Sequence, residues 1–370
     1  MQISIQVPEF ILGENTVLDT PEYLKRLEIK RPLLVTDQGL VRAGHVARLM
    51  DAFGVGGAPA CFDLTRENPT ANCVDLATQI YLQQGCDGIV ALGGGSVIDT
   101  AKLTAVTSTH GGSASDYLGQ SDKITNLASP IVAIPTTAGT GSEASSAAGI
   151  HPSGREISRG VNSRFVVPRL AICDPSLMAT LPSRLTAATG LDALSHCIEG
   201  YLARGDHPII DLLALQGIRL IKSNLSKAVD DNDPQARAEL MLAAFYGGLA
   251  IGKGLGAAHA IAISCGDQDL HHGVLSALGL VAILDSIEHH EGERCRAIKD
   301  ALDLDRGASL SEYIRATLVS FGLPRSLSQA GYRLADFRVL AQTCEASYFN
   351  KTSRVRFRFA DFESMLQKIS

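Results

Sequence analysis

Residues 87–102 read Asp-Gly-Ile-Val-Ala-Leu-Gly-Gly-Gly-Ser-Val-Ile-Asp-Thr-Ala-Lys. The apolar run at 87–92 has the length of a buried strand, and three glycines separate it from a segment with helical character. Strand–turn–helix units that repeat along a chain build a mostly parallel sheet with helices on both faces. The stretch therefore predicts an α/β fold for the part of the chain around it.

The same alternation extends over the first half of the chain. Apolar runs at 32–36 and 130–134 are further strand candidates, and residues 39–53 have helical character. From about Pro182 the pattern changes, because the Ala-, Leu- and Ile-rich segments 183–203 and 208–225 show helical periodicity without strand-like runs. We therefore expect an α/β domain at residues 1–181 and an all-helical domain at 182–370, with a ligand bound between them.

Composition excludes several classes of function. The chain has 370 residues and a net charge of −6, so it offers neither a basic footprint for nucleic acid nor a polybasic patch for membranes. Its eight cysteines form no CxxC pair, which argues against a zinc ribbon or a redox motif. Residues 1–7 alternate like a strand and lack the pattern of a signal peptide, which predicts a cytoplasmic protein. The weakly polar stretch 247–264 fits buried helices better than a membrane span.

Two loops are candidates for binding a nucleotide. Gly94, Gly95 and Ser96 lie between a strand and a helix, where the backbone can approach a pyrophosphate at the helix N-terminus; a simple tight turn explains the glycines equally well. The loop at 135–142 is rich in small hydroxyl residues and also follows a strand. Asp37, after the strand at 32–36, could accept hydrogen bonds from a ribose hydroxyl or could be a surface turn residue.

Histidines in the second half suggest a metal site. Asp192 and His196 are four residues apart, so on a helix they project from one face. The alternative is a capping role for Thr189 and Asp192, with His196 as an ordinary core histidine. His259 lies in an apolar, glycine-rich run where its imidazole needs a partner. With His272, or its neighbour His271, these residues form a ligand set that suits iron or zinc.

Taken together, several segments resemble the iron-containing (group III) alcohol dehydrogenase family over nearly the whole chain. The resemblance rests on five motifs, which are Glu67-Asn-Pro-Thr70, Gly93-Gly-Gly-Ser-Val-Ile-Asp-Thr-Ala-Lys102, Pro135-Thr-Thr-Ala-Gly-Thr-Gly-Ser-Glu143, Asp174-Pro-Ser-Leu-Met178 and Thr189-Gly-Leu-Asp-Ala-Leu-Ser-His-Cys-Ile-Glu-Gly-Tyr201. It implies an N-terminal dinucleotide-binding α/β domain and a helical, metal-binding catalytic domain, arranged as in dehydroquinate synthase. It also implies a homodimer.

The resemblance implies a role for individual residues. Metal ligation falls on Asp192, His196, His259 and His272. The nucleotide site falls on residues of the α/β half, which are Asp37, Asn68, Gly94, Gly95, Ser96, Asp99, Thr136, Thr137 and Thr140. An aspartate at position 37 goes with a preference for NAD over NADP, in agreement with the repulsion that it would exert on a 2′-phosphate. Asp99 could instead complement the dipole of the helix that follows the glycines.

The chain departs from the family pattern after His259. Many members carry a second histidine four residues later, a candidate proton relay, where this chain has Ile263. The usual Pro-Leu-Gly is replaced by Ser264-Cys-Gly-Asp267, and Gly252 replaces a common asparagine. We therefore expect His271 to take the proton, although a ribose hydroxyl or water could do so. Lys253 could pair with an acidic substrate or could simply be solvated.

The predicted function is an NAD(P)-linked, metal-dependent alcohol dehydrogenase or aldehyde reductase. Hydride would pass between the nicotinamide and a metal-bound alcohol or carbonyl, and the changes near Lys253 favour a hydroxylated or acidic substrate such as a sugar acid or hydroxy acid. Two alternatives are a dehydroquinate synthase-like lyase that uses NAD transiently, and a non-catalytic binding protein on the same scaffold. The ligand set does not separate Fe²⁺ from Zn²⁺.

Overall fold

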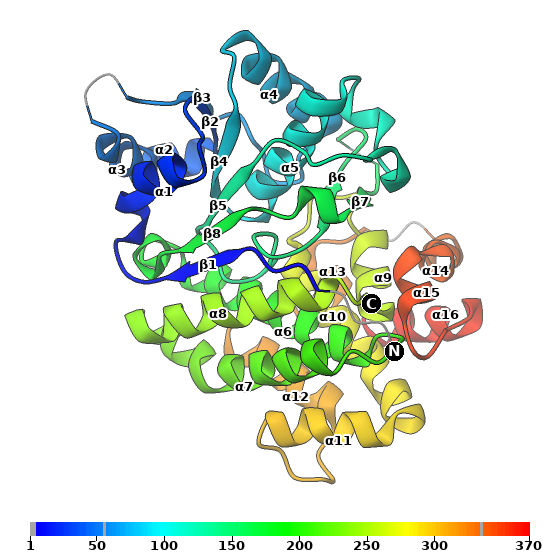
Figure 1. Cartoon of the computed structure of the whole chain (residues 1–370). Helices are drawn as coiled ribbons and strands as arrows, with labels where there is room; N and C mark the ends of the chain where they lie inside the picture. The colour runs from blue at the N-terminus through cyan, green and yellow to red at the C-terminus, as the bar shows by residue number, and fades with distance from the viewer. Residues whose placement is uncertain (1–4, 55–56, 155, 334–335) are drawn as a thin grey trace. The chain divides into compact units, whose positions relative to one another are not determined.

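The computed structural model describes residues 5–54, 57–154, 156–333 and 336–370. The chain divides into two compact units, which are shown together in Figure 1. The first consists of Met1–Thr137 and Gly141–Leu181, and the second of Ala138–Thr140 and Pro182–Ser370. In the described chain, every helix is too short or too polar to cross a bilayer.

A six-stranded parallel sheet forms the centre of the first unit. Its strands lie in the order β1-β8-β5-β4-β2-β3. Their bounds are β1 Glu9–Leu12, β2 Pro32–Val35, β3 Ala60–Phe62, β4 Gly88–Gly93, β5 Ile131–Pro135 and β8 Leu170–Cys173. The chain runs from β2 outward to β3 and then returns to β4 on the other side of β2. The order of the strands therefore reverses between β2 and β4.

Side chains that alternate along the strands build two cores, one on each face of the sheet. In β2, Leu33 and Val35 join one buried cluster and Leu34 joins the other, as the two-residue period of a strand requires. One face is covered by α1 (Thr20–Arg26) and α3 (His45–Ala52), and the other by α4 (Ala71–Gln83) and α5 (Gly95–His110). Burial on both faces explains why the strands are continuous apolar runs.

Two local predictions in the first unit need correction. The helical segment predicted at 39–53 is two helices, α2 (Gln38–Arg42) and α3, because Gly44 between them has φ +83°. The strand predicted at residues 1–7 is not found over the described residues 5–7, and residues 1–4 lie outside the described chain; the edge strand β1 begins at Glu9. A separate antiparallel hairpin joins β6 (Ala147–Ile150) to β7 (Arg159–Asn162).

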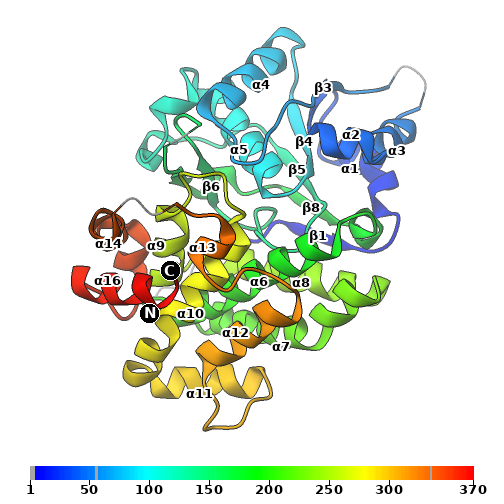
Figure 2. The ribbon, with the colours of Figure 1, turned by 180° about the vertical axis from the view of Figure 1, so that it is seen from behind.

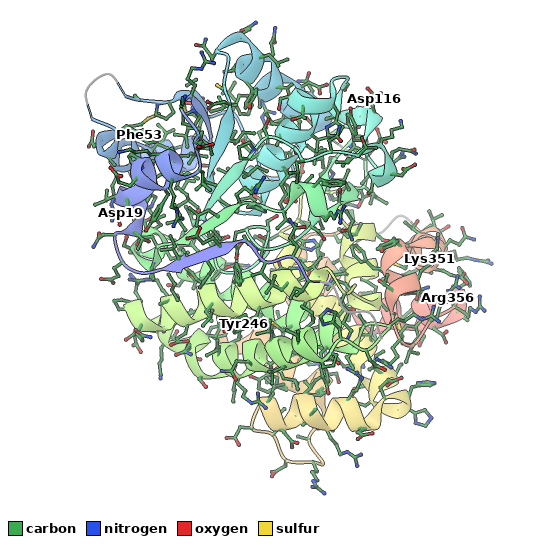
Figure 3. The ribbon with its side chains drawn as sticks, viewed as in Figure 1. Asp19, Phe53, Asp116, Tyr246, Lys351 and Arg356 are labelled. Carbon is green, nitrogen blue, oxygen red and sulfur yellow. The ribbon has the colours of Figure 1, made fainter. Side chains whose placement is uncertain are left out.

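Figure 3 shows the two helical layers of the first unit with their side chains. Phe53, at the end of α3, and Asp116, in a short 3-10 turn after α5, lie on opposite sides of this unit. The sheet is thus enclosed by helical structure on both faces, and its strand ends are the places where loops can gather functional residues.

The described part of the second unit is built from helices. Three long helices, α6, α7 and α8, pack on one another, and α10 packs on α6, α9 and α12. Figure 2 shows α6, α10 and α12 from behind. The helices are α6 Ser183–Leu202, α7 Pro208–Asp230, α8 Pro234–Ile251, α9 Ala257–Ser264, α10 His272–His290, α11 Gly292–Ala301, α12 Leu310–Ser320, α13 Leu327–Ala330, α14 Phe337–Ala346, α15 Tyr348–Thr352 and α16 Phe359–Lys368. The predicted fold class, a parallel α/β domain followed by an all-helical domain, is confirmed.

Candidate metal centre and nucleotide site

Helix α6 presents Asp192 and His196 on one buried face. The helix begins at Ser183, so Thr189 and Asp192 lie well inside it and the capping alternative is wrong. The Thr189 hydroxyl instead donates to the carbonyl of Leu185, one turn earlier. Asp192 and His196 are both buried, and a carboxylate and an imidazole one helical turn apart can ligate the same ion.

Two further helices bring histidines to this face. His259 lies in the first turn of α9, and His272 is the first residue of α10. Two glycines allow α10 to approach the other helices closely. A Cβ atom on Gly273 would lie 2.3 Å from the carbonyl oxygen of Ala188 in α6, and one on Gly279 would lie 2.5 Å from that of Ala258 in α9. Only glycine permits both contacts.

Three of the four predicted ligands form a tight cluster. One ligand atom from each of Asp192, His196 and His259 lies within 4.8 Å of the others. The His196 and His259 rings stack with centroids 4.7 Å apart, and the His272 centroid lies 5.4 Å from that of His259. His272 lies at the edge of the cluster, because its Nε2 atom is 3.9 Å from Asp192 Oδ1 and its side chain is 37% exposed.

Unpaired atoms in the cluster fit a divalent transition metal. Asp192 Oδ1 and His259 Nε2 are buried and have no hydrogen-bond partner among the described residues, a costly arrangement unless something else binds them. Burial lowers the pKa of His196 to about 4, and partial desolvation at the edge of the cluster lowers that of His272 to about 4, in both cases against the attraction of Asp192, so both imidazoles are neutral at pH 7. Burial opposes ionisation of Asp192, but the three histidines together hold its pKa below the ordinary value.

Two of the imidazoles are oriented by outer partners, which are groups that contact the ring nitrogen directed away from the proposed metal. His196 Nδ1 lies 3.2 Å from the carbonyl oxygen of Gly139, and His259 Nδ1 lies 2.5 Å from Glu199 Oε2. Such partners fix the tautomer and free Nε2 for a metal. Glu199 is a residue of this cluster that the sequence motifs do not predict. The signal that could indicate it is its position on α6, seven residues after Asp192 and therefore on the same helix face.

The predicted nucleotide residues of the first unit follow neighbouring strands at their carboxyl ends. Asp37 follows β2 and caps α2, where its Oδ1 accepts the Leu40 N–H at 3.0 Å. Gly94 follows β4, and Gly95 and Ser96 begin α5. Thr137 follows β5 and is close to Gly94, whose Cβ would lie 3.4 Å from Thr137 Oγ1. Because β2 and β4 flank the point where the strand order reverses, this edge is where open α/β sheets bind ligands.

The other predicted nucleotide residues lie in loops and in α5, and their contacts differ from one residue to the next. Thr136 directly follows β5, and its N–H donates to the Gly93 carbonyl. Asn68 has a left-handed backbone with φ +54°. Asp99 lies beyond the first turn of α5, so it is not a dipole complement; its oxygens accept from the Ser142 hydroxyl and from the Gly149 N–H. Thr140 belongs with Ala138 and Gly139 to the second unit.

Lys253 is neither solvated nor available to a substrate. Its Nζ atom lies 2.5 Å from Asp211 Oδ1 and donates to the carbonyl of Tyr201, and its side chain is 3% exposed. Arg294 contacts the same two partners. The ammonium group therefore belongs to a structural network between α6, α7, α11 and the segment that follows α8.

His271 lies beside a cavity of the second unit. It precedes α10, and its Nδ1 atom is buried without a hydrogen-bond partner among the described residues. The cavity has a volume of about 330 Å³ and is lined mainly by apolar side chains, including Leu185, Ala188, Leu270 and Val274. Arg184 contributes a charged side chain to the lining. The residue expected to move a proton thus has a buried imidazole nitrogen to which the described residues offer no hydrogen bond.

Comparisons with known proteins show the family. A family model described as "Iron-containing alcohol dehydrogenase" matches residues 8–175, and one described as "Fe-containing alcohol dehydrogenase family, C-terminal" matches residues 186–368. Together they cover almost all of both units.

Individual relatives agree with this match. The chain is 38% identical to a 4-hydroxybutyrate dehydrogenase of Cupriavidus necator over 93% of each chain, and 34% identical to an NAD-dependent methanol dehydrogenase of Bacillus methanolicus over 90% of this chain and 91% of that one. The crystal structure of a 1,3-propanediol oxidoreductase superposes with a TM-score of 0.93 at 29% identity, covering 100% of both chains. The chain therefore belongs to the iron-containing alcohol dehydrogenase family, whose members are metal-containing, NAD-dependent oxidoreductases that act on CH–OH groups.

Proposed function

We propose that this protein transfers a hydride between NAD and the carbinol carbon of a small alcohol held at Asp192, His196, His259 and His272. The observation that carries the proposal is the convergence of three helices on two buried ligand atoms, Asp192 Oδ1 and His259 Nε2, which have no hydrogen-bond partner among the described residues. A cluster that served only to pack the core would leave no such atoms without partners.

The net charge of the four ligands is compatible with binding of a substrate oxygen to the metal. Asp192 supplies one negative charge, and the imidazoles of His196, which is buried, and of His272, at the edge of the cluster, are neutral at pH 7. A divalent ion held by these residues would keep a net positive charge and would supply Lewis acidity to the oxygen of an alcohol or carbonyl substrate. His272 lies at the exposed edge, so we expect the substrate oxygen to approach from its side. The set accepts Fe²⁺ or Zn²⁺, and the family favours iron.

The first unit provides the features of an NAD site. The N-terminus of α5, with Gly94, Gly95 and Ser96, can receive the pyrophosphate through its N–H groups. Asp37 can accept hydrogen bonds from the ribose and repels a 2′-phosphate, which favours NAD over NADP. We propose Asn68, Asp99, Thr136 and Thr137, together with Thr140 of the loop that follows β5, as further contacts of the nucleotide.

His271 is the proposed proton acceptor. Ile263, one turn after His259, has no ionisable group, whereas the buried Nδ1 of His271 is free of hydrogen bonds within the described chain. An imidazole can accept the proton that leaves the alcohol and pass it to water.

We propose a short hydroxy acid, or the corresponding aldehyde acid, as the substrate class. The support is the 4-hydroxybutyrate dehydrogenase relative, whose identity of 38% exceeds the 34% of the methanol dehydrogenase. Lys253 is not its carboxylate partner, because Asp211 and Tyr201 already occupy it. The dehydroquinate synthase-like alternative is not proposed, because the alcohol dehydrogenase models match both units.

The test is a panel assay of the reconstituted enzyme. The protein, loaded with Fe²⁺ or Zn²⁺, is assayed for NADH formation with methanol, 1-butanol, 1,3-propanediol and 4-hydroxybutyrate, and in the reverse direction with the aldehydes. We expect NADH to accumulate, with the largest kcat/KM for 4-hydroxybutyrate. Activity confined to neutral alcohols would contradict the acid class, and failure of every substrate with either metal would contradict the dehydrogenase.

A further inference from the structure

Glu199 is a buried carboxylate placed against a metal-ligand histidine. It lies on α6, three residues after His196, and its side chain is 1% exposed. Its three hydrogen-bonding partners among the described residues all lie in the first turn of α9. Oε1 accepts the backbone N–H of Ala258 at 2.8 Å, and Oε2 accepts the backbone N–H of His259 at 3.0 Å. Oε2 also lies 2.5 Å from His259 Nδ1.

In each of these three contacts, the Glu199 oxygen must accept the hydrogen bond. Two of the partners are backbone N–H groups, which can only donate. The Nδ1 atom of His259 must carry a proton to pair with the same carboxylate, and this leaves the lone pair on Nε2, the atom for which the described residues offer no partner. An ionised carboxylate is acceptor-only and satisfies all three groups, whereas an amide would turn an NH₂ group towards a donor.

His259 differs in this respect from the neighbouring ligand on α6. The outer partner of His196 is a neutral backbone carbonyl, that of Gly139. Among the described residues, His259 is the cluster histidine whose Nδ1 faces a carboxylate. A carboxylate partner raises the basicity of an imidazole more than a carbonyl does, and so strengthens the bond to a metal.

We propose that Glu199 is a positioning residue of the metal centre, which holds the ring of His259 in the tautomer and orientation that direct Nε2 to the ion. The proposal rests on the proposed metal site. Its competitor is a purely structural role, in which Glu199 only satisfies the free N–H groups at the start of α9. A positioning residue would affect both the stability of the protein and its affinity for the metal, whereas a purely structural residue would affect only the stability.

The experiment measures the affinity of the full-length protein for Zn²⁺ by competition with a chelator of known affinity. Glu199→Gln is expected to weaken Zn²⁺ binding by about 10- to 100-fold, the range for outer partners of metal ligands. In a His259→Ala background, Glu199→Gln should change the affinity by less than about twofold, because the residue through which it acts is gone.

Glu288 provides a matched control. Its Oε1 accepts the N–H of Leu310, the first residue of α12, so it also caps a helix of the second unit, and its other partner is Lys299. Glu288→Gln should lower the unfolding temperature and leave the Zn²⁺ affinity unchanged. If Glu199→Gln behaves in the same way, its role is structural and the proposal is overturned. An equal loss of affinity with and without His259 would overturn it as well.

The same experiment distinguishes failure of the proposed metal site from failure of the proposed role of Glu199. If wild-type protein does not bind Zn²⁺ or Fe²⁺, the proposed function fails; if it binds and Glu199→Gln binds equally, only the role of Glu199 fails. Should Glu199→Gln not fold, Glu199→Asp keeps the charge and shortens the reach. A loss of at least about threefold in Zn²⁺ affinity would support the proposal, and unchanged affinity would overturn it.

Discussion

The carbonyl oxygen of Gly139 lies 3.2 Å from Nδ1 of His196. Gly139 belongs to the loop that follows β5, and the earlier part of that loop carries Thr136 and Thr137, two of the proposed nucleotide residues. One loop therefore combines proposed contacts of the nucleotide with an outer partner of a proposed metal ligand. A displacement of this loop should affect both sites.

Gly139→Ala tests this coupling. A Cβ atom at this position would lie 2.7 Å from the Cβ of Thr189 and 2.8 Å from its carbonyl oxygen, so the segment must move away from α6. We expect Zn²⁺ affinity to fall by about tenfold and the Kd for NAD to rise, as measured by chelator competition and by fluorescence titration. Gly154→Ala is the control, because a Cβ there meets no atom within 4 Å. Unchanged constants in Gly139→Ala would rule out the coupling.

Gly273→Ala tests whether close packing of α10 on α6 sets the metal geometry. The new Cβ would lie 2.3 Å from the Ala188 carbonyl oxygen and 3.1 Å from Asp192 Cβ. We expect a loss of about 1–3 kcal/mol in unfolding free energy from overpacking, together with weaker metal binding, since His272 precedes the displaced residue. Gly292→Ala, where a Cβ meets no atom within 4 Å, should change neither. Full Zn²⁺ affinity in Gly273→Ala would show that the contact does not position His272.

Asp37→Ser tests the basis of the NAD preference. Serine retains a side-chain acceptor for the Leu40 N–H, so the cap of α2 is kept while the charge is removed. The ratio of kcat/KM with NADP to that with NAD should rise by about tenfold, as expected from loss of one repulsive charge near a 2′-phosphate. Asp51→Ser, on the exposed side of α3, serves as the control. An unchanged ratio would remove Asp37 from its proposed role.

Much of this fold is predictable from local patterns. The strands of the parallel sheet are buried on both faces, so they are continuous apolar runs that stand out in the sequence. The break between α2 and α3 is harder to predict, because a glycine in a helical pattern often remains helical, and only its positive φ reveals the break. The edge strand β1 is short and only partly buried, which leaves little pattern to detect.

The candidate site was predictable only in part. Asp192 and His196 lie on one helix, so their spacing indicates a shared face. The contact between Glu199 and His259 joins residues 60 positions apart, and no local pattern contains it. The pairing of Lys253 with Asp211 is equally hidden in the sequence, because it depends on how α7 packs against the end of α8. Partners across helices require the tertiary structure.

Glu143 predicts a pH dependence of stability in the first unit. Burial raises its pKa from the ordinary 4.5 to about 7, although the Lys102 ammonium opposes this. The folded protein thus binds a proton that the unfolded chain has lost between these values, so this contribution is complete below pH 4.5 and is lost as the pH rises through about 7. Relative to wild type, Glu143→Gln should gain on the order of 1–3 kcal/mol as the pH is raised over this window.

Urea unfolding of both proteins across the window measures this difference. Glu22→Gln, at an exposed position of α1, should follow the wild type at each pH. A constant difference between Glu143→Gln and the wild type would show that Glu143 is ionised in the folded protein throughout.

The most direct test of the central claim is the metal content of the protein after reconstitution with Fe²⁺ or Zn²⁺ and gel filtration, measured by mass spectrometry of the element. We expect about one ion per chain in the wild type and loss of most of it in His259→Ala, which removes the buried Nε2 that has no partner among the described residues. A wild-type protein without bound metal, or a His259→Ala variant with the same content, would contradict a metal site at these residues.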